Sequence, residues 1–200
     1  MYFLRACEYF NRYRMFGDFP IITEPLVDDA AILTEASKRQ PRTEVARFIL
    51  SDLDKAIELL GATTMSKTRI SKDVALLFKS RVALFEGTWL KYFKGTAFVP
   101  NGEGWPGKNK DYNSGYQFQS GSIDNEINFF LDEAMKASKE VAEKYKGQLT
   151  VNTGKLQQSE TDEANPYYDM FASTDLSGVN EVLLWRQYAH CLLYTSPSPR

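Results

Sequence analysis

Residues 44–60, EVARFILSDLDKAIELL, and residues 69–93, RISKDVALLFKSRVALFEGTWLKYF, decide the fold of this 200-residue chain. In both stretches apolar side chains recur every three or four positions, which is the spacing of a helix that buries one face. Thr43 and Ser71 are suited to N-cap the two helices. Two helices joined by so short a turn pack antiparallel. The sequence therefore predicts an αα-hairpin, the unit from which tetratricopeptide-like proteins are built.

Further helices are expected on both sides of this hairpin. Residues 2–16 carry apolar side chains on most faces and predict a largely buried helix, whereas residues 124–146 carry one apolar side and predict an amphipathic helix. Within the second helix of the hairpin, Arg81 and Glu86 are candidates for an interior ion pair, although solvated side chains are the commoner outcome. Near the end of the chain, the short apolar run 181–188 is compatible with a strand.

The segment 94–121 interrupts the helical pattern. It contains six glycines, two prolines and five aromatic residues. Irregular segments longer than roughly 12–15 residues are usually functional or disordered, and disordered segments are poor in aromatic residues. An ordered loop is therefore expected here. Together these patterns predict a mainly α fold, with tetratricopeptide-like helical hairpins and a long irregular loop lobe.

Composition and charge exclude several classes of function. The net charge is −2 and the pI is about 5.6, so the chain lacks the basic balance that nucleic-acid binding favours. His190 is its single histidine, and Cys7 and Cys191 lie far apart with no CxxC pair, so neither a histidine triad nor a zinc site is expected. No apolar run reaches the roughly 18 residues of a transmembrane helix. The sequence therefore predicts no metal, no cofactor and no nucleic-acid partner.

The loop 94–121 offers residue types that bind sugars. Sugar rings stack their C–H faces on aromatic side chains, and their hydroxyls form hydrogen bonds with amide and carboxylate groups. The candidate ligand-binding residues are Trp105, Tyr112, Tyr116, Asn109, Asp111 and Asn113. A second interpretation is that the aromatic residues fold back and pin the loop onto the helices. The two interpretations are compatible, because pocket lining and loop anchoring can share residues.

No catalytic residues are predicted. The carboxylate doublets Asp52/Asp54 and Asp132/Glu133 invite comparison with glycosidases, which use two facing carboxylates. Neighbouring positions on a helix point in different directions, however, so neither doublet forms a catalytic pair by itself. The sequence therefore favours a protein that binds its ligand without cleaving it.

Three stretches, in this order and spacing, resemble the RagB/SusD family of surface nutrient-binding lipoproteins from Bacteroidetes outer membranes. They are residues 12–26 (RYRMFGDFPIITEPL), 44–60 and 69–93, and the segment 181–185 (EVLLW) agrees with them. The resemblance implies a SusD-like helical fold that carries its ligand site in an irregular lobe. It also implies a non-enzymatic protein that captures a glycan, oligosaccharide or other nutrient and sits over a TonB-dependent, SusC-like transporter.

The same resemblance implies a surface-exposed lipoprotein of the cell outer membrane that serves polysaccharide utilisation. The membrane attachment that it implies is an N-terminal lipid anchor, which is expected upstream of this chain. Ligand residues are not part of the shared motifs, so the candidate residues above come from the composition of the loop alone. An alternative function is a helical-repeat scaffold that binds protein partners and no small molecule.

Residues 1–190 are expected to be part of a SusD-like domain that continues beyond both ends. Residues 191–200, CLLYTSPSPR, match the translation of a common sequencing adapter. They are rich in serine and proline and share no periodicity with the preceding segment. They are therefore expected to be non-native and to contribute nothing to the fold.

Overall fold

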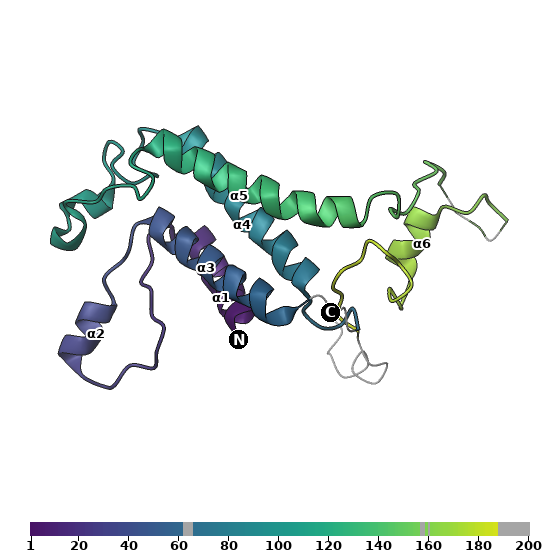
Figure 1. Ribbon diagram of the computed structural model, residues 1–200, viewed down its shortest axis with the longest axis horizontal. Helices are drawn as coiled ribbons and strands as arrows, with labels where there is room; N and C mark the ends of the chain where they lie inside the picture. The colour runs from purple at the N-terminus through teal and green to yellow at the C-terminus, as the bar shows by residue number, and fades with distance from the viewer. Residues whose placement is uncertain (62–65, 157–158, 160, 188–200) are drawn as a thin grey trace, which may run out of the picture.

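The computed structural model describes residues 1–61, 66–156, 159 and 161–187. Within these residues the protein is mainly helical, as the sequence predicts. The long helices are α1 (Tyr2–Phe16), α3 (Arg42–Leu60), α4 (Lys72–Phe93) and α5 (Ile123–Lys144). The short helices α2 (Ala30–Ala36) and α6 (Pro166–Ala172) lie away from the long ones, at opposite ends of the molecule (Figure 1).

Each long helix packs against the next long helix along the chain: α1 on α3, α3 on α4, and α4 on α5 (Figure 1). This nearest-neighbour stacking is typical of helical-repeat proteins, and α3 with α4 forms the predicted αα-hairpin. One apolar core joins all four helices, and its fully buried members include Tyr13, Ile49, Leu53, Leu90 and Phe130. The prediction of a mainly α fold built on helical hairpins is confirmed.

Most helix ends follow local sequence signals, but the beginning of α3 does not. Ser71 caps α4 by accepting a hydrogen bond from the N–H of Val74, as predicted. The N-cap position of α3 is occupied by Pro41, and the predicted cap Thr43 lies buried inside the first turn. A distant carboxylate does the capping instead: Asp18 Oδ1 accepts the N–H of Arg42 at 2.9 Å. An acidic group at a helix N-terminus also interacts favourably with the helix dipole.

Buried ion pairs join the long helices. Their carboxylates are almost fully buried, and the pairs are Arg5–Asp52 between α1 and α3, Arg42–Glu86 between α3 and α4, and Arg47–Glu126 between α3 and α5. Glu86 therefore pairs with α3, while Arg81 is exposed. The candidate Arg81–Glu86 pair is wrong, because α3 brings Arg42 to within 2.8 Å of Glu86. The alternative of solvated side chains is confirmed for Arg81 and wrong for Glu86, which is fully buried.

The segment after α5 returns to the α3–α4 turn. The N–H of Trp185 donates to the carbonyl of Lys67 at 3.0 Å, and Lys67 Nζ donates to the carbonyl of Val179. Leu183 packs against the core. Over 181–187 the backbone forms no strand, so the strand interpretation is wrong for the described part of this run. Residues 188–200, which include the adapter-like segment 191–200, lie outside the described residues.

Lys79 on α4 joins two other helices and provides a test of acid stability. Its Nζ lies 2.6 Å from Glu133 Oε2 on α5 and 2.7 Å from Asp54 Oδ1 on α3. Burial disfavours the ionised form of Glu133, but hydrogen bonds from Lys79 and Lys136 outweigh it and hold the pKa of Glu133 below its ordinary value. Burial likewise opposes the charge of Lys79, and its hydrogen bonds to Asp54 and Glu133 raise its pKa.

Because the pKa of Glu133 is lowered by folding, its contribution to stability is present above its unfolded pKa and is lost as the pH falls through its folded pKa. Glu133→Gln is therefore expected to reduce the loss of stability between about pH 5 and pH 3, measured by urea unfolding at a series of pH values. The control is Glu140→Gln, which removes an exposed partner of Lys72 and should follow the parent. If the free energy of unfolding of Glu133→Gln falls with pH as steeply as that of the parent, Glu133 does not contribute to the acid sensitivity of the protein.

Candidate functional site

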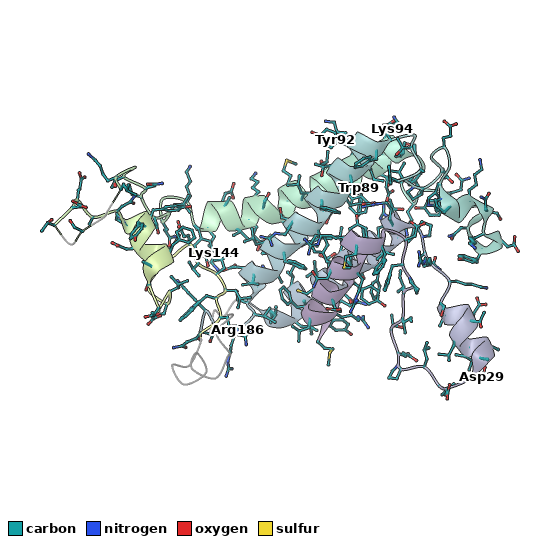
Figure 2. All side chains as sticks on the ribbon, turned by 180° about the vertical axis from the view of Figure 1, so that it is seen from behind. Asp29, Trp89, Tyr92, Lys94, Lys144 and Arg186 are labelled. Carbon is teal, nitrogen blue, oxygen red and sulfur yellow. The ribbon has the colours of Figure 1, made fainter. Side chains whose placement is uncertain are left out.

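A pocket of about 740 Å³ opens where the loop 94–121 meets one end of the helical stack. Its walls come from the end of α1, the chain after α2, the first turn of α3, the last turns of α4 and the loop. Trp89, Tyr92 and Lys94 mark this end of α4 in Figure 2, and Lys144 marks the far end of α5. Segments that are distant in the sequence therefore build the pocket together.

Trp105 anchors the loop and does not offer its ring to solvent. Only 3% of its surface is exposed, and its Nε1 donates to Asp18 Oδ2 at 2.8 Å. Gly107 lies against the indole, where an added Cβ would come within 2.2 Å of Trp105 Cζ2. A side chain at this position would displace the ring. The loop-anchoring interpretation of Trp105 is thus the one that its geometry supports.

Asp18 connects three parts of the pocket. One carboxylate oxygen caps α3 through the N–H of Arg42, and the other accepts from Trp105. Burial raises the pKa of Asp18 above its ordinary value, and the hydrogen bonds from Trp105 and Arg42 only partly oppose this. The turn after α1, the start of α3 and the loop are held in one arrangement by this single side chain.

Tyr116 and Asn113 also fix the loop to the helices. Tyr116 Oη lies 2.6 Å from Thr43 Oγ1 and donates to Glu44 Oε1 at 3.0 Å, and burial raises its pKa well above the ordinary value. Asn113 is buried, and its Nδ2 donates to the carbonyl of Arg39 at 3.1 Å. These contacts explain why a segment with so many glycines is ordered.

The remaining candidate residues face outward. Tyr112 is 42% exposed and lines the pocket, with Lys38 Nζ 5.6 Å from the centre of its ring. Asn109 and Asp111 are exposed, and neither lines this pocket. The structure therefore brings Trp105, Tyr112 and Asn113 to one pocket and leaves Asn109 and Asp111 outside it.

Two exposed aromatic rings in the pocket were not among the predicted ligand residues. Phe16, at the end of α1, is 49% exposed, and Phe98 in the loop is 61% exposed. Trp89 also lines this pocket, and the guanidinium of Arg42 lies 4.3 Å from the centre of its ring. Phe98 could have been predicted, because it lies in the loop 94–121, whose aromatic-rich composition suggested a ligand site. No local signal connects Phe16 with that loop.

A smaller pocket of about 510 Å³ lies beside the first, and Tyr112 and Asn113 line both. Its other walls are polar and include Glu44, Tyr116 and three glutamines, Gln40, Gln117 and Gln119. Amide and carboxylate groups of this kind bind hydroxyl groups through hydrogen bonds. The two pockets together offer aromatic faces on one side and hydroxyl partners on the other.

The described part of the chain lacks two other features, a cluster of metal ligands and a membrane-spanning helix. No group of three histidine, cysteine or acidic side chains there is arranged to hold a metal ion. Among the described helices, none combines the length and the apolar character needed to cross a membrane.

Comparisons with known proteins agree with the motifs. Residues 1–84 match the family SusD-like_3, described as "Starch-binding associating with outer membrane". The chain is 35% identical over 102 residues to the SusD-like protein P2 of Formosa agariphila, an alignment that covers 51% of this chain and 20% of that protein. No solved structure matches the chain. The resemblance to RagB/SusD proteins is confirmed by the family match and by this relative.

Proposed function

Because residues 1–84 match the SusD-like_3 family, we propose that this chain is a member of it, binds a glycan or oligosaccharide at the cell surface and delivers it to a TonB-dependent, SusC-like transporter. The protein is then a surface lipoprotein of the outer membrane, attached through a lipid anchor upstream of the chain. It does not cleave its ligand. Three of the four carboxylates considered for glycosidase chemistry support this, because Asp52 pairs with Arg5 while Asp54 and Glu133 both bind Lys79.

The observation that carries this proposal is the group of exposed aromatic rings around the larger pocket. Phe16, Phe98 and Tyr112 come from two separate segments and are partly open to solvent at one opening. The volume of about 740 Å³ lies in the range of small-molecule sites, roughly 300–1,000 Å³. Aromatic faces of this kind suit the C–H faces of sugar rings, and buried residues such as Trp105 hold the loop that presents them.

We also propose that residues 1–190 belong to a longer SusD-like domain and that residues 191–200 are not native. The first part is supported by the relative, because the aligned stretch spans one fifth of that protein's length. Amplifying the source gene from genomic DNA tests both parts. Codons for CLLYTSPSPR in the genomic sequence would contradict the second. The binding experiments below use the complete product of that gene.

Substitutions of the exposed rings test the proposed site. An aromatic stacking contact is worth about 0.5–1.5 kcal/mol, so Phe98→Ala and Tyr112→Ala are each expected to weaken oligosaccharide binding roughly two- to tenfold. Affinity gels with a panel of polysaccharides, followed by calorimetry on those that bind, measure the change. The control is Tyr92→Ala, which removes an 80% exposed ring on α4 outside the pocket. Parental affinity in both pocket variants would place the site elsewhere.

The scaffold alternative has one observation in its favour. Leu77, Leu84 and Tyr92 are exposed along one side of α4, at 43%, 50% and 80% of their surfaces. Such a stripe suits a protein partner better than a sugar. The scaffold function replaces the glycan proposal if two results are found together. No polysaccharide binds, and Leu84→Asp abolishes the binding of a protein partner that the parent protein captures.

A further inference from the structure

The larger pocket is positively charged although the chain as a whole carries a net charge of −2. Its lining contains four basic side chains, Arg14, Arg39, Arg42 and Lys110, and one acidic side chain, Asp18. The two acidic residues that lie nearby on the loop, Glu103 and Asp111, are exposed and not part of the lining. Positive charge is therefore concentrated in this one hollow.

The charged groups of Arg42 and Asp18 already form hydrogen bonds within the protein. Arg42 donates to Glu86 and to Tyr13, and both oxygens of Asp18 accept hydrogen bonds. These groups hold the pocket together, because Nε and Nη2 of Arg42 and both carboxylate oxygens of Asp18 have hydrogen-bond partners in the fold. A ligand therefore meets the other three basic side chains.

Arg14, Arg39 and Lys110 remain open to a ligand. Each is exposed, and none has a carboxylate within ion-pair distance in the part of the chain that the structure describes. Arg14 contacts Asn11 and lies over the ring of Phe10, so its charge is not neutralised. Guanidinium groups bind planar or tetrahedral anions with two hydrogen bonds at once.

The neighbouring pocket has the opposite character. Its lining has Glu44 as the one charged side chain, together with the three glutamines. Charge therefore distinguishes two adjacent hollows that share Tyr112 and Asn113. A neutral sugar unit fits the second pocket, and an anionic unit fits the first.

We propose that the ligand of this protein is an acidic glycan, whose carboxylate or sulfate groups are bound by Arg39 and Lys110, with Arg14, while its rings stack on Phe98 and Tyr112. This inference rests on the proposed glycan-binding function. It deepens that function by naming the substrate class. Exposed ion pairs are screened by salt, so binding of the acidic glycan weakens as the ionic strength rises.

Calorimetry with three oligosaccharides of equal length tests the proposal on the complete gene product. The probes are tetragalacturonate, which carries carboxylates, a carrageenan tetrasaccharide, which carries sulfates, and maltotetraose, which is neutral. At least one of the charged probes is expected to bind about tenfold or more tightly than maltotetraose. The charged probe that binds more tightly identifies the anionic group.

A double variant, Arg39→Gln with Lys110→Gln, is expected to remove this preference. The control is Arg81→Gln with Lys91→Gln, which removes two exposed charges from α4 outside the pocket and should retain the preference. Equal losses in the two double variants would show unspecific attraction and overturn the proposal. The proposal is also overturned if the variant Arg39→Gln with Lys110→Gln keeps the parental preference for the charged probe over maltotetraose.

The outcomes separate this inference from the function on which it rests. Maltotetraose binding as tightly as both charged probes overturns the acidic-glycan inference and leaves glycan binding intact. Failure of all three probes, and of the polysaccharide panel, counts against glycan binding itself and against the inference with it.

Discussion

Glu86→Ala is expected to lower the free energy of unfolding by about 3–5 kcal/mol. Glu86 is fully buried between α3 and α4, and its Oε2 accepts hydrogen bonds from Arg42 at 3.0 and 2.8 Å and from Tyr13. Removing the carboxylate leaves the guanidinium of Arg42 buried with Tyr13 as its remaining polar partner. An uncompensated buried charge is far costlier than a lost surface pair.

Urea unfolding followed by circular dichroism measures this change. Glu86→Gln keeps the shape and one acceptor, so an intermediate loss is expected. The control is Glu8→Ala, which breaks the exposed pair with Arg12 on α1 and should change stability by less than about 1 kcal/mol. A loss below about 1 kcal/mol in Glu86→Ala would show that the buried pair does not hold α3 to α4.

Trp105→Ala is expected to lower the free energy of unfolding of the loop and its attachment by about 3–5 kcal/mol. The indole is buried, donates to Asp18 and packs on Gly107. Its loss leaves a cavity and removes a hydrogen bond from the half-buried carboxylate of Asp18. Glycan binding falls as well, because Phe98 and Tyr112 are carried on the loop that Trp105 fixes.

Two readouts separate an anchoring role of Trp105 from direct ligand contact. Limited proteolysis within 94–121 should become much faster in Trp105→Ala and stay at the parental rate in Tyr112→Ala. Trp105→Phe keeps most of the apolar ring and loses the donor to Asp18, so a smaller loss of about 1–3 kcal/mol is expected. Lost binding in Trp105→Ala with parental stability and proteolysis would make Trp105 a ligand contact instead.

The helices could be predicted because their signals are local. Apolar spacing predicted α1, α3, α4 and α5, and Ser71 caps α4 as expected. The beginning of α3 could not be predicted in this way, since its cap is Asp18, which lies 24 positions away in the sequence. The partner of Glu86 was missed for the same reason, because Arg42 reaches it only after α3 packs on α4.

The candidate pocket could be predicted from the sequence in its position along the chain, but not in the identity of all its lining residues. The composition of 94–121 correctly marked an ordered loop that contributes to a pocket. It could not show which aromatic rings face inward, because that depends on Asp18 and Thr43 as partners of Trp105 and Tyr116. It also could not bring Phe16 and Arg39 to the same opening. Composition can predict that a loop contributes to a pocket. The packing of the loop against the helices decides which of its side chains stay exposed in that pocket.

A crystal structure of the complete gene product with the oligosaccharide that binds most tightly would show whether the pocket between the end of α1 and the loop 94–121 is the glycan site. We expect a sugar ring against Phe98 and Tyr112, with its anionic group directed to Arg39 and Lys110. A sugar bound at another surface, with this pocket empty, would contradict this expectation.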